Sequence, residues 1–278
     1  MKTITRRLAH GVNGIIGLSL LGVVLVLVVL DVTGLGMKDV LAQNGALSFH
    51  APSSSHIFGT DQFGRDILSR SIAGLVNSLR IGLIAVAIAS IIGTTLGILG
   101  GFVGGILDDA ISRMSDLLFA FPAVLLALAI VSALGPGSFN TAIAIAIVYV
   151  PIFVRVARGP VLTLREREFV KAASLLGFSS RRVMRHHILP NLAAPVIVQI
   201  SLSLSWAVLT ESGLSFLGLG TQPPNPSLGL MVSEAQAFAS TAWWTLLFPS
   251  IFIVLLVVTF NMLGDGLRDA LDPSWNRE

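Results

Sequence analysis

The sequence RVARGPVLTLREREFVKAASLLGFSSRRVMRHHILPN, residues 155–191, holds eight of the 18 Lys and Arg residues of the chain and only two acids, Glu166 and Glu168. Long apolar runs lie on both sides of it. Lys and Arg accumulate in the cytoplasmic loops of membrane proteins. The stretch is therefore predicted to be a cytoplasmic loop, and its length and helical pattern imply that it has a task of its own.

The composition is that of an integral membrane protein. Of the 278 residues, 54% are hydrophobic and only 12% are charged, whereas a soluble domain carries about 25% charge. The mean hydropathy is +0.84 and the pI is about 9.9; we attribute the basic residues to membrane topology rather than to nucleic-acid binding. The absence of cysteine excludes disulfides and thiol nucleophiles, and five scattered histidines predict no metal centre.

Six apolar runs predict an all-α protein with six transmembrane helices, at about residues 12–30, 79–102, 115–134, 141–154, 192–209 and 246–263. The first run exceeds the ~7–15 residues of a secretory signal core and is long enough to span. Residues 1–75 would form this helix and an external loop, and residues 76–278 the transmembrane core.

Three features of these runs predict details of the helices. Gly93, Gly97 and Gly101 share one helix face, and small residues at this spacing let helices approach closely. Phe121-Pro122 predicts a kink in the third span. Pro151 is expected to interrupt a short fourth span.

The basic residues also predict the orientation. An N-in, C-in arrangement places fourteen Lys and Arg inside and four outside; the inner set is Lys2, Arg6, Arg7, Arg113, the eight of the central loop, Arg268 and Arg277, and the outer set is Lys38, Arg65, Arg70 and Arg80. This asymmetry strongly favours both termini on the cytoplasmic side.

Two external segments carry weaker signals. Around residues 65–72, an amphipathic elbow is expected to present Ile67, Leu68 and Ile72 on one side and Arg65, Asp66 and Arg70 to water; a plain solvated connector fits equally well. Residues 211–226 would contact an external protein, form part of an outer gate, or pack as a re-entrant loop.

Catalytic signals are absent from the sequence. There is no GxxxxGK[ST] phosphate loop, HExxH or GxSxG motif, so no catalytic residue is predicted and ATP is not bound in the phosphate-loop manner. The ionisable groups Asp116, Glu211 and Asp265 lie near span ends, where the cost of a charge falls. Asp116, Glu211 and Ser215 are kept as candidate pathway or gate residues, although Asp116 would also fit a simple pair with Arg113.

The basic loop itself has the pattern of a helical hairpin. Thr163 and Glu166 have capping-box spacing. A stripe of Phe169, Ala172, Ala173 and Leu176 follows, and Gly177 fits a helix C-terminus. Ser179 or Ser180 would cap a second short helix that carries Arg181, Arg182 and Arg185 and ends at Ile188-Leu189-Pro190. The apolar stripe either packs on the protein's own span ends or docks a soluble partner.

At these residues the loop resembles the EAA loop of ABC importer permeases, with the pattern Glu-Ala-Ala-x3-Gly-x9-Ile-x-Leu-Pro. Here it reads Lys171-Ala172-Ala173, Gly177 and Leu189-Pro190, with Lys171 in place of Glu and His187 in place of Ile. Further segments resemble the C-type permease subunit of dipeptide/oligopeptide importers, namely HIFGTDQFGRDILSR (56–70), LREREF (164–169), SFLGLGTQPP (215–224) and NMLGDGLRDALDP (261–273).

This resemblance implies a type I ABC importer permease in the bacterial cytoplasmic (inner) membrane. Its partners would be a homologous second permease, cytoplasmic ATP-binding subunits that hold ATP and Mg, an external solute-binding protein and membrane lipid; the chain itself would bind no cofactor. The ATPase-coupling residues would be Glu168, Lys171, Ala172, Ala173, Leu176, Gly177, Phe178, Arg181 and Arg182. The two last arginines and Arg185 would meet either acidic ATPase residues or lipid headgroups.

Two alternatives to a peptide permease remain open from the sequence. Importers of nickel and other small solutes share the same framework. A self-sufficient secondary carrier is disfavoured, because it would need buried ionisable groups in its spans and few are present. A membrane enzyme is weaker still, because no nucleophile–base pair is visible.

Overall fold

The computed structural model describes residues 11–271, and within them regular structure is helical apart from one isolated bridge between Thr60 and Asp66. Five helices are long and apolar enough to cross a membrane, or six if one bent pair counts as a span. The elements are α2 (Val12–Thr33), η1 (Gly45–Leu47), α3 (Ile67–Val103), α4 (Gly105–Phe119), α5 (Ala123–Leu134), α6 (Ser138–Leu164), α7 (Glu168–Leu175), α8 (Ser180–Val183), η2 (Met184–Ile188), α9 (Leu189–Phe216), α10 (Leu228–Ala235), η3 (Gln236–Phe238) and α11 (Trp243–Leu271). The expected all-α membrane fold is confirmed.

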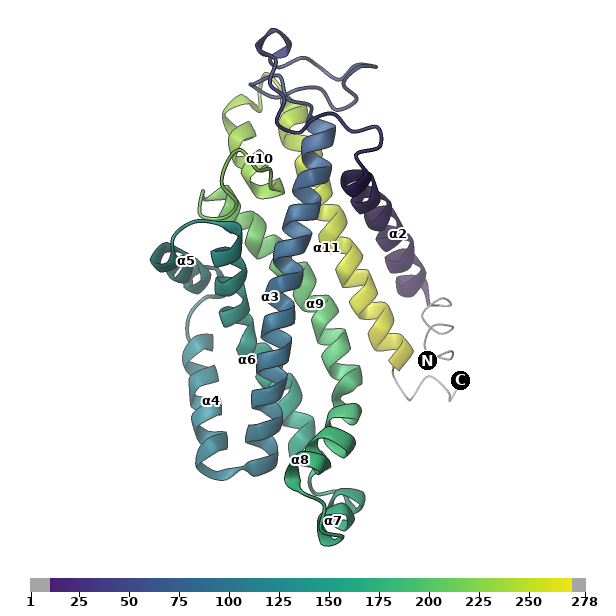
Figure 1. Ribbon diagram of the computed structural model, residues 1–278, viewed down its shortest axis with the longest axis vertical. Coiled ribbons are helices and arrows are strands. Elements are labelled where there is room, and N and C mark those ends of the chain that lie inside the picture. Colours follow the sequence, from purple (N-terminus) through teal and green to yellow (C-terminus); the bar gives the residue numbers. More distant parts are fainter. Residues whose placement is uncertain (1–10, 272–278) are drawn as a thin grey trace.

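The long helices α3, α6, α9 and α11 run along the long axis of the molecule (Figure 1). The first span is found where it is expected, but the others extend well beyond their apolar runs. Helix α3 begins at Ile67, so the expected division between residues 75 and 76 falls inside an unbroken helix. With 37 residues, this helix is roughly 55 Å long at 1.5 Å per residue, so it projects from an apolar layer of ~30 Å.

The expected third span is not one straight helix. Helices α4 and α5 meet at an angle of 94° across a break at residues 120–122. Pro122 stands at the N-cap of α5, where its ring starts a new helix instead of kinking an old one. Helix α4 lies beside the end of α3, near the tip formed by α7 and α8 (Figure 1).

The expected interruption of the fourth span at Pro151 is wrong. Helix α6 continues through both Pro151 and Pro160 and ends at Leu164. The first ten residues of the basic stretch therefore belong to a spanning helix. The first part of the external segment 211–226 is likewise helical, since α9 continues to Phe216.

The glycine face of α3 packs on α6, as predicted. A Cβ atom on Gly93 would stand 2.5 Å from the carbonyl oxygen of Val150, and one on Gly97 would stand 2.6 Å from that of Val154. A Cβ on Gly101 would meet Val161 at 3.0 Å. The two backbones therefore approach at distances that only glycine permits.

Helix α2 packs antiparallel on α11. A Cβ on Gly17 would lie 2.8 Å from Leu263 N, and one on Gly266 would lie 2.7 Å from Gly14 Cα. The start of α2 and the end of α11 are thus at the same end of the molecule, as an N-in, C-in arrangement requires. Lys2, Arg6, Arg7 and Arg277, which contribute to the predicted orientation, lie outside the described residues.

The expected wet side of the external elbow is wrong. This segment is the start of α3, and Arg65, Asp66 and Arg70 are 4%, 7% and 1% exposed. Asp66 caps α3 by accepting a hydrogen bond from Ser69 N at 3.0 Å. The polar side is buried because loops far apart in sequence cover it.

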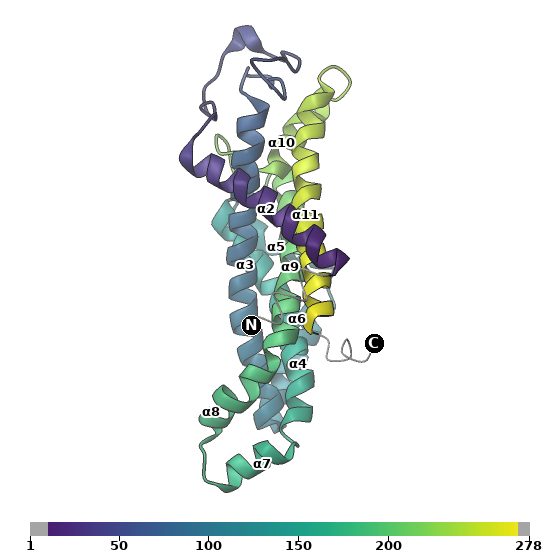
Figure 2. The same ribbon diagram turned by 90° about the vertical axis from the view of Figure 1, so that its right-hand side faces the viewer.

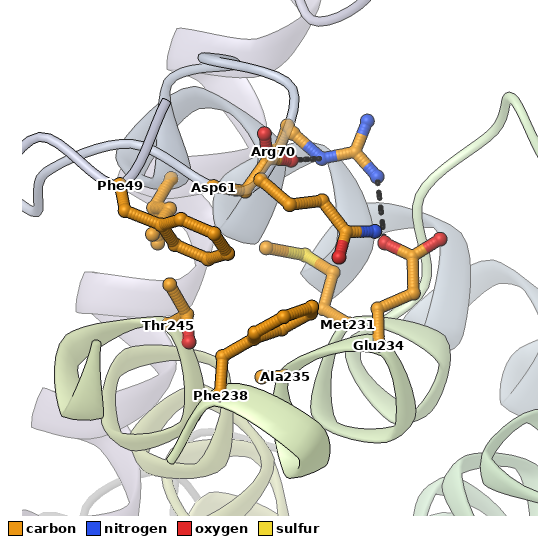
Figure 3. Close-up of a pocket in the computed structure, with 10 residues that line it drawn as sticks. Phe49, Asp61, Arg70, Met231, Glu234, Ala235, Phe238 and Thr245 are labelled. Carbon is orange, nitrogen blue, oxygen red and sulfur yellow. Dashed lines mark ion pairs between the residues drawn. The ribbon is translucent and has the colours of Figure 1, made fainter. Parts of the chain in front are cut away.

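The buried arginines are held by two carboxylates. Arg65 Nε lies 2.6 Å from Asp61 Oδ2, and its terminal nitrogen lies 3.2 Å from Glu234 Oε2 on α10. Arg70 reaches the same carboxylates at 3.6 and 3.8 Å, beside a cavity of about 20 Å³ that Phe49, Met231 and Phe238 also line (Figure 3). These ion pairs fasten the outer loop to α10.

We expect Gly97→Leu to destabilise the protein, because its side chain would collide with the α6 backbone; overpacking costs roughly 1–3 kcal/mol or more. The midpoint of thermal unfolding of the purified protein measures the effect. The matched control is Gly22→Leu on α2, since a Cβ there has no heavy atom within 4 Å. Equal midpoints for the two variants would contradict the close packing.

Candidate functional site

The second half of the basic stretch forms a compact tip at one end of the molecule. Helix α7 crosses below the ends of the long helices, and α8 leads back into α9 (Figures 1 and 2). The outer loops and α10 lie at the opposite end of the long axis. The predicted helical hairpin is therefore present, at one end of the bundle.

One side of α7 is seated on the spans. Val170 and Ala173 are 2% and 4% exposed. They belong to an apolar cluster, called here the inner seat, whose other buried members are Ile98 of α3, Ala157 and Val161 of α6, Val183 of α8, Ile188 of η2 and Leu192 of α9. Thus a helix of only eight residues shares one apolar cluster with the ends of three long helices.

The other side of α7 is bare. Leu175 and Leu176 are 89% and 76% exposed, Phe169 is 45% exposed, and Ala172 is also exposed. The expected single stripe therefore divides: Ala173 faces the protein's own spans, and Ala172 and Leu176 face away from them. Packing on the protein's own spans is therefore found for Ala173, and docking of a soluble partner stays a prediction for the exposed residues.

Two expected helix caps are not formed. Thr163 lies in the last turn of α6, so the Thr163–Glu166 pair does not start α7. Ser179 stands at the N-cap of α8, but its side chain makes no capping hydrogen bond. Helix α8 passes through the π-helical turn η2 into α9, so Leu189-Pro190 lies in a continuing helix instead of ending one.

Gly177 ends α7 as predicted. Its φ is +80°, in the left-handed region that side chains disfavour. The next residue, Phe178, donates its N–H to Ala173 O at 3.1 Å, which closes the end of the helix. No atom lies within 4 Å of a Cβ at this position, so glycine is required here for conformation and not for space.

An aromatic cluster holds the two arms of the hairpin together. The His187 ring stacks near Phe178, with centroids 6.4 Å apart, and lies 6.2 Å from Phe169. The Arg182 guanidinium lies over the Phe178 ring, 4.4 Å from its centroid. Sequence reasoning noted His187 only as a replacement for Ile; its neighbours show that it still fills an apolar role by stacking.

Lys171, which replaces the Glu of the motif, pairs with an acid inside the loop. Its Nζ lies 3.0 Å from Glu166 Oε2, and Arg165 Nε lies 3.4 Å from Glu166 Oε1. Lys171 lowers the pKa of the exposed Glu166 carboxyl below its usual value, first through their hydrogen bond. Glu168 remains exposed at the start of α7.

Asp116 does not pair with Arg113 as suggested. Arg155 of α6 donates to Asp116 Oδ1 at 2.8 Å, and both side chains are more than half exposed. A neighbouring pair is tighter: Arg158 donates to both carboxylate oxygens of Asp108, at 2.5 and 2.7 Å. The latter contact, which sequence reasoning missed, ties α4 to α6.

Glu211 and Ser215 are buried together. Both are 0% exposed, and Ser215 Oγ donates to Glu211 Oε1 at 2.7 Å. The hydroxyls of Ser78, Ser212 and Ser227 surround the same carboxyl, from α3, α9 and the start of α10. The two candidate gate residues therefore lie in a closed polar cluster in this conformation, and their role in a pathway stays a prediction.

The larger part of the chain matches a known protein family. Residues 93–277, which include α6, the hairpin and α9, match the family described as Binding-protein-dependent transport system inner membrane component. The chain belongs to this family. It is a multi-pass membrane protein and a transport component.

Curated relatives extend the match to most of the chain. It is 51% identical to a dipeptide transport system permease protein DppC of Alkalihalophilus pseudofirmus, covering 83% of this chain and 76% of the relative. It is 48% identical to a di/tripeptide transport system permease protein of Pseudomonas aeruginosa, with 78% and 72% covered. A glutathione transport system permease protein of Pectobacterium atrosepticum is 44% identical, with 80% and 74% covered. The resemblance to peptide importer permeases is thereby confirmed.

Solved structures support the fold. The inward-facing MetNI methionine ABC transporter matches with a TM-score of 0.59 at 16% identity, covering 74% of this chain and 97% of that one. An amino acid ABC transporter matches with a TM-score of 0.56 at 16% identity, covering 72% and 94%. The predicted ABC importer permease fold is confirmed by these likenesses.

We expect Gly177→Val to loosen the end of α7, because a β-branched residue opposes positive φ. A strain of ~1–2 kcal/mol would speed local opening by a factor of roughly 5–30. Hydrogen exchange of the α7 amides in the lipid-embedded protein measures this rate. Gly177→Asn is the control, since Asn tolerates the left-handed region; equal exchange in both variants would show that φ at this position does not matter.

Proposed function

We propose that this chain is a permease subunit that moves dipeptides or oligopeptides across the bacterial cytoplasmic membrane by alternating access. ATP hydrolysis on a separate cytoplasmic subunit drives the movement. The peptide assignment is supported by relatives named for dipeptide, di/tripeptide and glutathione transport. Nickel and other small solutes, open from the sequence, find no such support among these relatives.

The observation that carries the proposal is the two-sided α7. One side is fixed in the inner seat, and the other leaves Leu175 and Leu176 almost fully exposed at a tip outside the apolar spans. Burying a leucine side chain is worth about 1.5–3 kcal/mol, so this surface gains by docking in an apolar groove. The ATP-binding subunit would provide that groove.

The inner seat supports a mechanical role for the docked helix. Its apolar members come from α3, α6, α7, α8, η2 and α9, and interiors packed in this way are nearly incompressible. A displacement of α7 is therefore passed to the ends of three spans. The alternation between inward- and outward-facing states would follow from that displacement.

The remaining partners are those that membership of the family implies. A homologous second permease would complete the pathway, a solute-binding protein would deliver peptide from outside, and lipid would surround the spans. ATP and Mg belong to the ATP-binding subunit. We expect this chain itself to bind no cofactor and no nucleic acid.

The test places a charge on the bare side of α7. We expect Leu176→Asp to abolish co-purification of the ATP-binding subunit and to lower ATP-driven peptide uptake by at least about tenfold, because losing one buried leucine costs at least one decade. Membrane insertion should be normal. Ala173→Glu would test docking less directly. Ala173 is buried against the spans, so a glutamate there would also disturb the inner seat.

The matched control is Leu35→Asp, which makes the same change at a 68% exposed residue of the outer loop. It should leave co-purification intact. Normal ATPase binding by Leu176→Asp would contradict the docking surface. Peptide transport by this chain alone in ATP-free vesicles would refute the proposed function as a whole.

A further inference from the structure

A groove of about 480 Å³ opens on the outer half of α3 and is not used by the coupling mechanism. Its walls come from the last turns of α2, the outer part of α3, the start of α6 and residues 225–226. Two charged side chains line it, Asp31 from α2 and Arg80 from α3. The groove therefore combines both signs of charge with apolar walls.

Arg80 lies well inside helix α3 and not at its start. It is the fourteenth residue of α3, roughly 20 Å from the start of that helix at 1.5 Å per residue. The other charged residue that lines the groove, Asp31, stands near the outer end of the first span. Arg80 thus lies at the outer boundary of the apolar layer, where the cost of an ionised side chain falls and a polar ligand can reach it.

The guanidinium of Arg80 has no partner of its own. Among residues 11–271 it forms no ion pair or hydrogen bond, and its side chain is exposed to the groove. Arg70, ten residues earlier on the same helix, is instead buried between Asp61 and Glu234. Arg70 thus has two carboxylate partners that hold it in the structure, and Arg80 has none among residues 11–271.

The groove wall is already held by other contacts. Asn77 donates to Thr221 Oγ1 at 2.9 Å and to Pro226 O at 3.0 Å, and Thr221 also lies 3.0 Å from Ser138 Oγ. These bonds fasten the 221–226 segment to α3 and α6 without Arg80. The arginine is therefore available for a ligand.

We propose that this groove receives the transported peptide and that Arg80 binds its C-terminal carboxylate. The planar guanidinium fork matches a carboxylate with two parallel hydrogen bonds. Asp31 gives the groove a negative group for the peptide ammonium. This inference rests on the proposed peptide transport and names the residue that would recognise a free peptide terminus.

The experiment uses the assembled importer in vesicles with its binding protein and labelled dialanine. Arg80→Gln should lower ATP-driven uptake by about tenfold, because a charge-assisted hydrogen bond is lost, while stimulated ATP hydrolysis persists. Arg80→Lys should recover part of the uptake. Arg113→Gln, at an exposed arginine outside the groove, is the matched control and should transport normally.

The absence of cysteine in the chain provides a second measurement. Arg80→Cys can be modified with a cationic or a neutral methanethiosulfonate reagent, with the wild-type importer as the reagent control. The cationic adduct should restore uptake and the neutral one should not. Dialanine should slow the modification, and dialanine amide, which lacks the carboxylate, should not.

Each other outcome overturns the inference. Normal uptake by Arg80→Gln, or equal protection by dialanine and its amide, would show that Arg80 does not bind the carboxylate. A defect that disappears in vesicles of phosphatidylcholine alone would assign Arg80 to an anionic lipid headgroup. If the wild-type importer takes up no peptide with ATP, the proposed function itself fails, whatever the Arg80 variants do.

Discussion

The close contact between the glycine face of α3 and the backbone of α6 is the constraint on which the other parts depend. Pro151 and Pro160 both remove a hydrogen bond inside α6 and would kink an isolated helix. Gly93 and Gly97 lie against residues 150–158, on the same stretch of α6, and hold it at a distance that leaves no room for a Cβ atom. Tertiary packing thereby keeps α6 continuous to Leu164, only four residues before α7 begins.

The inner seat follows from that continuity. A helix of eight residues is not stable in water on its own, since helix nucleation is costly. Helix α7 is therefore ordered because Val170 and Ala173 are buried against side chains from three spans. The same burial couples its position to theirs, so α7 cannot shift without either moving the spans or exposing apolar surface. The apolar contacts that stabilise α7 are therefore the same contacts that would transmit its movement to the spans.

The sequence predicted the membrane class, the number of apolar runs and the place of the hairpin, because hydropathy and the spacing around Gly177 are local signals. It failed where the cause is distant. Helices α3, α6 and α9 extend beyond their apolar runs, since hydropathy marks where a segment becomes polar and not where its backbone bonds end. Arg70 was expected in water because its partner, Glu234, is 164 residues away. The split of the α7 stripe likewise depends on α3 and α9, which periodicity within α7 cannot reveal.

The tip and the 221–226 segment are stabilised by different forces, and this difference suits alternating access. Helix α7 is joined to the spans by apolar contacts in the inner seat, whose exposure costs about 1.5–3 kcal/mol for each large side chain. The outer 221–226 segment is joined through Asn77, Ser138 and Thr221 by hydrogen bonds, each worth only ~0.5–1.5 kcal/mol net because water can replace the partner. Contacts that water can replace open at little cost when the outer side becomes wet. A force applied at α7 is therefore expected to leave the inner seat intact and to separate the 221–226 segment first.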